Sequence, residues 1–186
     1  MNAARNPFRS DRIEALRFRF PAQLDHEALR IRWGNCGRRG AIVGPEGTGK
    51  TTLLLEVADR LRREGERVVW VTVRTGNGTG WRSILAVPAG GVVLLEGGER
   101  LGALGRLLVR FRLRCWHGFL MTAHAPAFVP TILRTATTPE LVAELVRDLD
   151  AETARTAPVA ALWERHGGNA RGVFGALYDR AASAPG

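Results

Sequence analysis

The residues with the clearest chemical meaning are Gly44 to Thr51, which read Gly-Pro-Glu-Gly-Thr-Gly-Lys-Thr. A glycine, four residues and then Gly-Lys-Thr is the spacing of a loop that wraps phosphate groups. Its glycines let the backbone curl so that successive N–H groups point into one concavity, and a helix that begins at the lysine adds the positive end of its dipole. Lys50 is the sole lysine in a chain with 27 basic residues. A compact ammonium suits a tightly held phosphate better than a planar guanidinium does.

The chain around this loop has the strand and the helix that such a loop requires. Residues 41–43 form a short apolar run before it, and apolar residues at helical spacing predict a helix from Lys50 to Glu64 after it. We expect the Lys50 ammonium to contact the β- and γ-phosphates of a nucleoside triphosphate, with ATP as the cofactor, and the Thr51 hydroxyl to bind Mg²⁺. The residues expected to bind the nucleotide are Gly44, Pro45, Glu46, Gly47, Thr48, Gly49, Lys50, Thr51 and Thr52.

Polar side chains also stand at the ends of two further predicted strands. The apolar composition of residues 92–96 predicts a buried strand that ends in Glu96. We expect the Glu96 carboxylate to bind the metal through water by ordering the water molecules around Mg²⁺. Residues 118–122 form another strand, with Thr122 at its end and His124 just beyond it. Because ligands of open α/β sheets bind at the carboxyl edge, Thr122 and His124 are candidates to sense the γ-phosphate. His124 equally suits a simple loop cap.

Glu99 is the next acid after Glu96, and two interpretations of it remain open. Hydrolysis needs a residue that orients the attacking water, and Gly97, which directly follows Glu96, has no side chain for this. Glu99 is a candidate base in its place. It is equally an acid favoured by the dipole at the start of a helix, which is predicted over residues 99–116.

The predicted elements give an α/β fold followed by helices. Strands are expected at residues 41–43, 68–73, 92–96, 118–122 and 131–135, and they alternate with helices, which predicts a parallel five-stranded sheet with helices on its faces. After Thr137 the pattern changes to three amphipathic helices and no strand. Pro139 is expected at the first turn of the first of them, and Asn169 as the cap of the last.

The order of these features resembles that of the AAA+ and related P-loop ATPases of the ASCE type. A phosphate loop, an acid-tipped strand, a polar-tipped strand and trailing helices follow one another as they do in small clamp-loader, origin-recognition and transposition-helper ATPases. The resemblance implies a three-layer P-loop NTPase core and a small C-terminal helical lid. The domains expected on this basis are residues 1–35 as an N-terminal segment packed on the core, residues 36–137 as the core, and residues 138–186 as a three-helix, lid-like subdomain.

The same resemblance implies roles for single residues. Gly168 to Arg171 is similar to the Gly-x-x-Arg signature that opens the last lid helix, which implies that Arg171 reaches over the nucleotide. Thr122 resembles the polar sensor of AAA+ proteins, and His124 resembles the switch histidine of transporter-type ATPases. Asn6-Pro7-Phe8 resembles a segment that lies against the adenine. The family's water-activating glutamate would stand where this chain has Gly97. The segment 124–130 also has no arginine to act as a finger in a neighbouring subunit, so the sequence gives no support for an oligomer.

Charge suggests an acidic partner. The net charge is +9, and Arg106, Arg110 and Arg114 recur every four residues on one predicted helix. This stripe would suit a nucleic acid or an acidic protein, or it is a solvated face in an arginine-rich chain. No run approaches the roughly 20 apolar residues of a membrane span, and no secretory signal is evident, so we expect a cytoplasmic protein that does not enter the membrane.

Three functions fit these observations. The first is magnesium-dependent ATP binding with slow hydrolysis by a small AAA+-like ATPase or nucleotide switch that acts on a macromolecular partner. The second is a small-molecule or nucleotide kinase, against which the arginine-free segment 124–130 counts. The third is a non-hydrolytic nucleotide-binding module that uses a basic interaction surface.

Overall fold

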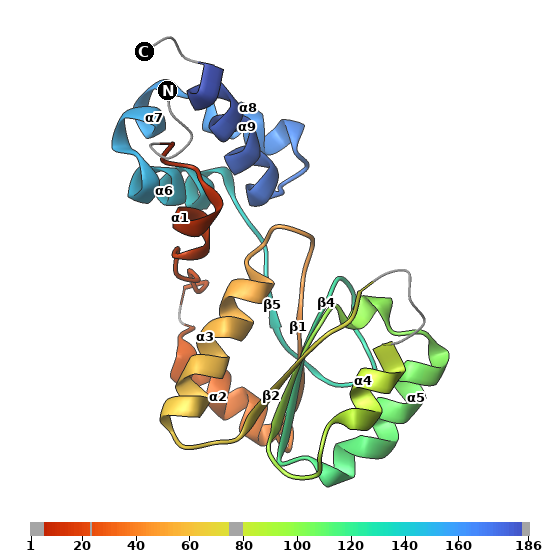
Figure 1. Ribbon diagram of the computed structural model, residues 1–186. Coiled ribbons are helices and arrows are strands. Elements are labelled where there is room, and N and C mark those ends of the chain that lie inside the picture. The colour runs from red at the N-terminus through yellow and green to blue at the C-terminus, as the bar shows by residue number, and fades with distance from the viewer. Residues whose placement is uncertain (1–5, 23, 75–79, 184–186) are drawn as a thin grey trace. The chain divides into compact units, whose positions relative to one another are not determined.

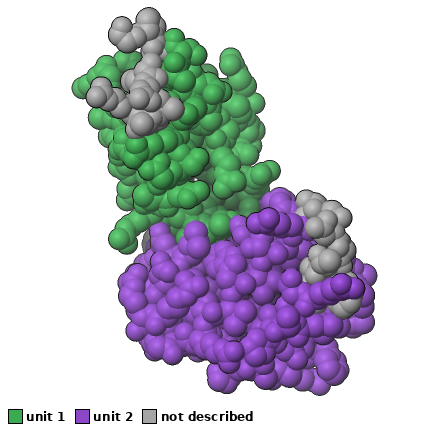
Figure 2. All heavy atoms as spheres, viewed as in Figure 1, with its two compact units in different colours: residues 1–19, 45–52, 136–186 green, residues 20–44, 53–135 purple. Residues whose placement is uncertain are grey.

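The chain divides into two compact units, coloured separately in Figure 2. The computed structural model describes residues 6–22, 24–74 and 80–183. Unit 1 takes in residues 1–19, 45–52 and 136–186, and unit 2 takes in residues 20–44 and 53–135. Within the described ranges, no helix combines the length and the apolar character that crossing a bilayer requires. Both units are discontinuous in sequence, unlike the contiguous segments 1–35, 36–137 and 138–186 expected above.

Unit 2 contains the five-stranded sheet, and all of its strand pairs are parallel, as predicted. The strands are β1 (Arg39–Val43), β2 (Val68–Thr72), β3 (Val92–Glu96), β4 (Gly118–Ala123) and β5 (Thr131–Arg134). Their order is β2-β3-β4-β1-β5. The central strands β1, β3 and β4 are almost wholly buried, which explains why they read as continuous apolar runs. Because β4 lies between β1 and β3, three carboxyl ends meet at the same sheet edge.

Helices cover both faces of this sheet (Figure 1). On one side lie α2 (His26–Asn35) and α3 (Lys50–Arg63), and on the other lie α4 (Gly80–Ala86) and α5 (Ala103–Arg112). The apolar stripe of α3 that the sequence predicts is buried from Leu53 to Leu61. The core beneath α4 and α5 centres on Phe119, Met121 and Leu95 of the sheet. Unit 2 is therefore the three-layer α/β core that the sequence predicts.

The helix predicted over residues 99–116 is broken into three pieces, which is a correction. A 3-10 turn, η2 (Gly98–Arg100), precedes α5, and a second one, η3 (Leu113–Cys115), follows it. Gly102 takes an extended conformation just before α5, so the helix starts later than predicted. Leu101, Gly105 and Val109 are buried, whereas Leu104 and Cys115 are exposed. Arg114 falls in η3, so the three-arginine stripe does not lie on a single helix.

Unit 1 gathers the N-terminal segment and the C-terminal helices around a separate core. Its helices are α1 (Ser10–Glu14), α6 (Pro139–Leu149), α7 (Ala151–Thr156), α8 (Val159–Arg165) and α9 (Ala170–Ser183). Four of them lie within the described residues 138–183, where three were predicted. The additional break occurs because Asp150 ends α6 and caps α7, where its side chain accepts a hydrogen bond from Thr153 N. Pro139 stands in the first turn of α6 as predicted, and Asn169 Oδ1 accepts a hydrogen bond from Gly172 N in the first turn of α9.

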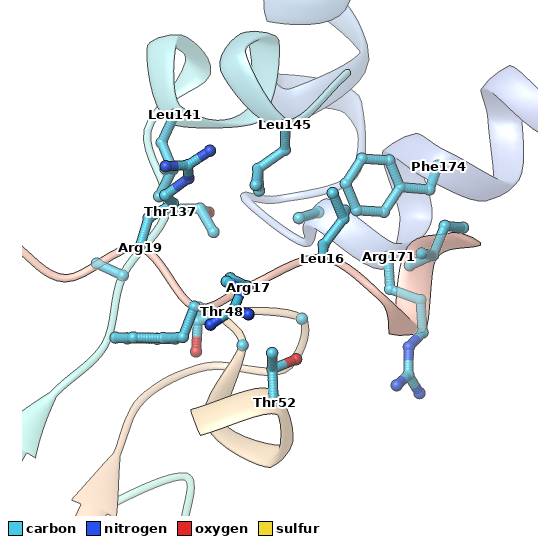
Figure 3. A pocket seen from close by; sticks show the side chains of 16 residues that line it. Leu16, Arg17, Arg19, Thr48, Thr52, Thr137, Leu141, Leu145, Arg171 and Phe174 are labelled. Carbon is cyan, nitrogen blue, oxygen red and sulfur yellow. The ribbon is translucent and has the colours of Figure 1, made fainter. Parts of the chain in front are cut away.

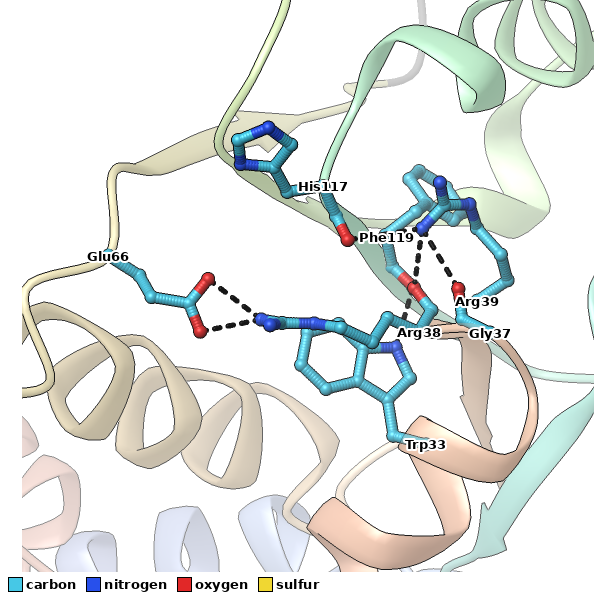
Figure 4. A network of polar contacts seen from close by, with 7 residues as sticks. All are labelled: Trp33, Gly37, Arg38, Arg39, Glu66, His117 and Phe119. Carbon is cyan, nitrogen blue, oxygen red and sulfur yellow. Dashed lines mark hydrogen bonds and ion pairs between the residues drawn. The ribbon is translucent and has the colours of Figure 1, made fainter.

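At the amino edge of the sheet, a polar network joins β1 and β4 to α2 (Figure 4). The Arg38 guanidinium donates twice to the carboxylate of Glu66, at 2.6 and 2.8 Å, and lies 4.6 Å from the Trp33 ring centroid. Trp33 Nε1 donates to the carbonyl of Phe119 at 3.0 Å. Arg39 donates to backbone carbonyls that precede β4, and burial lowers its pKa. These contacts hold the amino edge of the sheet together.

Candidate phosphate-binding site

The loop with the phosphate-binding spacing joins β1 to α3, in the strand and helix context predicted for it. At its start, Gly44 N donates to the carbonyl of Ala123 at the end of β4, at 3.1 Å. A Cβ atom at Gly44 would lie 2.2 Å from Thr135 Oγ1, so only glycine fits there. Gly44, where the loop begins, is thus held at the carboxyl ends of the neighbouring strands.

Two further glycines of the loop have backbone angles that other residues rarely adopt. Gly47 has φ 73° and Gly49 has φ 81°, both in the left-handed region that glycine enters without steric cost. Both also have close neighbours within unit 1. A Cβ atom added to Gly47 would lie 1.9 Å from Asn169 Oδ1, and one added to Gly49 would lie 3.1 Å from Phe18 Cδ2. The glycine spacing therefore serves both the turn and the approach of two other segments to the loop.

Lys50 is the first residue of α3 and is 8% exposed. Its Nζ donates to the carbonyl of Pro45, and Thr48 Oγ1 donates to the same carbonyl at 2.9 Å. The first turn of α3 reads Lys-Thr-Thr-Leu and has no acidic side chain, so no side-chain carboxylate in that turn competes for the positive end of the helix dipole. The lysine and the helix start together favour an anion.

A cavity of about 120 Å³ in unit 1 adjoins this loop (Figure 3). Its apolar lining includes Leu16, Leu145 and Phe174, whose side chains point toward one another in Figure 3. Residues of the loop also line it, namely Gly47, Thr48, Gly49 and Thr52. An apolar cavity beside a phosphate loop can take a flat apolar group that is linked to a phosphate.

Arg171 lines this same cavity from the first turn of α9. It is exposed, and its guanidinium extends away from the apolar group of Leu16, Leu145 and Phe174 in Figure 3. Arg171 thus lines the same cavity as residues of the phosphate loop, and its reach over a nucleotide stays a prediction. Arg17 and Phe18 also line the cavity. The sequence did not indicate them, because single residues in an N-terminal segment form no motif.

Phe8 is packed inside unit 1 and is not among the residues that line the cavity. We expected Asn6-Pro7-Phe8 to lie against a nucleotide base, but Phe8 is 2% exposed and belongs to the core of unit 1. Asn6 Nδ2 donates to the carbonyl of Tyr178 in α9 at 2.9 Å. The part of the N-terminal segment that lines the cavity is residues 13–19.

The other predicted residues belong to unit 2, at the carboxyl ends of β3 and β4. Glu96 ends β3, and its Oε2 accepts a hydrogen bond from Thr72 Oγ1 at 3.3 Å. Thr122 is 3% exposed, and its Oγ1 accepts a hydrogen bond from Gly97 N at 3.1 Å. Gly97 has φ 81°. Thr122 therefore holds the turn that follows Glu96, a role that the sequence did not suggest.

Glu99 and His124 face each other beside a cavity of about 230 Å³. Glu99 Oε1 lies 3.8 Å from His124 Nε2 and 3.7 Å from Arg100 Nε. Glu99 Oε2 is buried and has no hydrogen-bond partner among the described residues. Arg106 and Phe128 line the same cavity. A carboxylate oxygen without a partner, next to an imidazole and a cavity, can accept a proton from a molecule held there.

Within the described part of the chain, no group of three or more histidine, cysteine, aspartate or glutamate side chains is placed to hold a metal ion. The two residues that the sequence proposed for Mg²⁺ offer a hydroxyl, from Thr51, and a carboxylate, from Glu96. Both are hard oxygen donors, the type that magnesium prefers alongside phosphate oxygens and water. Their chemistry therefore fits the ion.

Comparison with known proteins gives a distant likeness and no family assignment. The sequence matches no protein-family model. It is 39% identical over 75 residues to the Fe(3+) ions import ATP-binding protein FbpC of Serratia marcescens. These residues are 38% of this chain but 21% of that relative, so the chain spans about a fifth of the length of the curated relative it matches. Together with the loop and the parallel sheet, this likeness indicates a P-loop NTPase.

Proposed function

We propose that this protein binds ATP with Mg²⁺ and hydrolyses it slowly, as a small AAA+-like ATPase or nucleotide switch that acts on a macromolecular partner. One observation carries the binding. The buried Lys50 ammonium begins α3 at the end of a complete phosphate loop, and the loop adjoins an apolar cavity within the same unit.

In this proposal the loop holds the triphosphate and the cavity holds the base. The loop N–H groups and Lys50 bind phosphate oxygens, and their attraction is strong because the site is partly shielded from water. The base enters the cavity between Leu16 and Phe174, and Arg171 lies at its rim on the first turn of α9. The name of the similar FbpC protein, an ATP-binding protein, supports ATP as the nucleotide.

Thr51 and, through water, Glu96 would hold the magnesium ion. When bound, the ion neutralises phosphate charge and favours attack at the γ-phosphate. Thr72 Oγ1 donates to Glu96 Oε2, which helps to orient this carboxylate for such a role.

For hydrolysis, Glu99 would take the role of the water-activating glutamate, because Gly97 occupies that position and has no side chain. Its unpartnered Oε2 would accept a proton from the attacking water, and His124, 3.8 Å away, would orient the carboxylate or contact the γ-phosphate. The strand order supports this, because it makes β4, which leads into His124, the neighbour of both β1 and β3. A kinase would need an acceptor site with cationic contacts, and the segment 124–130 that follows β4 has no arginine.

Replacement of Lys50 tests the binding proposal. Charge-assisted hydrogen bonds are worth about 1.5–3 kcal/mol, so we expect Lys50→Ala to weaken Mg-ATP binding about 10- to 100-fold in calorimetric titration. Arg60→Ala is the matched control, since it removes one positive charge from an exposed position of the same helix and should bind as the wild type does. Wild-type affinity in a folded Lys50→Ala variant would rule out this site.

A further inference from the structure

Helix α5 carries a row of large apolar side chains that face solvent. Leu104 is 55% exposed, Leu107 is 64% exposed and Phe111 is 77% exposed. Spacings of three and four residues place all three on one face of the helix. The opposite face, with Gly105 and Val109, is already buried against the sheet. The row therefore contributes nothing to the packing of unit 2, so its presence calls for another explanation.

Arginines border this row. Helices α4, α5 and the turn η3 contain five arginines and no acidic residue, namely Arg82, Arg106, Arg110, Arg112 and Arg114. Arg112 donates to the carbonyl of Val87, and Arg106 donates to the carbonyl of Leu101 at 2.9 Å. Arg110 and Arg114 are exposed, and neither has an ion-pair partner within the described ranges. The exposed surface thus combines an apolar row with uncompensated positive charge.

The apolar row decides what kind of partner fits. A nucleic-acid duplex would pair its phosphates with Arg110 and Arg114, but its stacked bases would leave Leu107 and Phe111 without a matching surface. The row is also one residue wide and follows the heptad spacing that seats a single helix, whereas a helix that lies on a membrane has a broad apolar face. A narrow seam of this kind suits another helix.

Charge decides the character of that helix. Two copies of α5 would bring the arginine rows of equal sign together, in a chain whose net charge is already +9, and like charges beside a seam oppose pairing. Acidic residues beside the apolar positions of the partner would instead pair with Arg110 and Arg114. The partner is therefore a different, acidic chain.

We propose that the exposed face of α5, formed by Leu104, Leu107, Phe111 and Arg110, is a docking site for an acidic amphipathic helix of a partner protein. The partner helix has apolar residues at heptad spacing and aspartate or glutamate beside them. This surface lies within unit 2.

A designed peptide tests the proposal directly. The probe is a fluorescent helical peptide of about three heptads, with leucine at the two seam positions and glutamate at the flanking ones. The comparison peptide has lysine in place of the glutamates. We expect the acidic peptide to bind the wild-type chain, and Phe111→Ser and Leu107→Ser each to weaken this binding about tenfold in fluorescence anisotropy. Leu55→Ser is the control, because Leu55 is 48% exposed on α3, away from this face.

Several results would overturn the proposal. These are no binding of the acidic peptide, equal binding of the lysine peptide, or an affinity that Phe111→Ser leaves unchanged. Duplex DNA or phosphatidylglycerol vesicles could instead bind more tightly than the acidic peptide. If Arg110→Ser abolishes that binding and Phe111→Ser does not affect it, the surface binds phosphate groups. Self-association of the wild type that Phe111→Ser removes would assign it to a second copy of this chain.

Discussion

Glu99 is the residue whose surroundings bear most directly on hydrolysis. A buried carboxylate oxygen without a hydrogen-bond partner in the protein is unfavourable, and water, an ion or a catalytic role are the usual reasons for it. Glu99 Oε2 is of this kind among the described residues, and the Oε1 atom of the same carboxylate lies 3.8 Å from His124 Nε2. Glu96, by contrast, accepts a hydrogen bond from Thr72. The two acids thus have different environments, which favours a metal role for Glu96 and a proton-accepting role for Glu99.

Glu99→Gln should separate hydrolysis from binding. Loss of a general base typically costs about 10²–10⁴-fold in rate, so we expect steady-state phosphate release to fall at least a hundredfold while Mg-ATP affinity stays near that of the wild type. Glu144→Gln, at an exposed position of α6, should change neither quantity. Undiminished turnover in Glu99→Gln would exclude this glutamate as the base. A wild type without turnover would instead favour the non-hydrolytic binding module.

Motif residues were predictable, but their neighbours were not. The loop residues are adjacent in sequence, so their spacing alone predicts the turn that Gly47 and Gly49 make. The proximity of Glu99 and His124 depends on β3 and β4 being neighbours, which no local pattern specifies. The contact between Thr122 and Gly97 depends on it too.

Among the elements, strands and capped helices were predictable because their signals are local. Residues 92–96 are apolar on both faces, and Pro139 marks the start of α6. Breaks within helices were not predicted, because they depend on which of two conformations a single residue takes. Gly102 is extended and delays α5, and Asp150 ends α6 by capping α7. The sequence pattern permits a continuous helix at either place.

The contact between α2 and α3 should make the stability of unit 2 depend on pH through His26. Its Nε2 lies 2.9 Å from Glu56 Oε2 of α3. Burial lowers the pKa of His26 below the ordinary value of 6.5, Arg60 lowers it further, and Glu56 and Asp25 oppose this only in part. A histidine that resists protonation when folded takes up its proton more readily when unfolded. Its contribution to stability is therefore present above the unfolded pKa and is lost as the pH falls below about 6.5.

Urea unfolding at pH 7.5 and pH 5.5 would measure this effect. We expect the wild type to lose more stability between these pH values than His26→Gln loses, since the variant lacks the titrating group. His117→Gln, at an exposed position, should show the wild-type pH dependence. An equal loss in the wild type and in His26→Gln would show that other groups cause the dependence.

At the scale of the whole molecule, the hydrophobic cores of both units are built from discontinuous segments. In unit 2, one core cluster joins the sheet to α4 and α5, and the apolar stripe of α3 is buried as well. The core of unit 1 joins α6, α8 and α9 to Phe8 from the other end of the sequence. Sequence reasoning located the C-terminal helices but not their N-terminal partner, because one phenylalanine in a polar segment has no periodicity to indicate its burial.

Phe8→Ala should therefore loosen unit 1 and leave unit 2 unchanged. Phe8 is 2% exposed, and removing a buried phenylalanine side chain typically costs about 3–5 kcal/mol. Hydrogen exchange measured by mass spectrometry should show faster exchange in α6 and α9 and unchanged protection in β3 and β4, because local opening reports the stability of each cooperative part. Phe111→Ala is the matched control, since that ring is 77% exposed and its loss should alter neither. Equal loss of protection in both units would mean that the two cores unfold as one, and the pocket beside the phosphate loop would then be only as stable as the sheet.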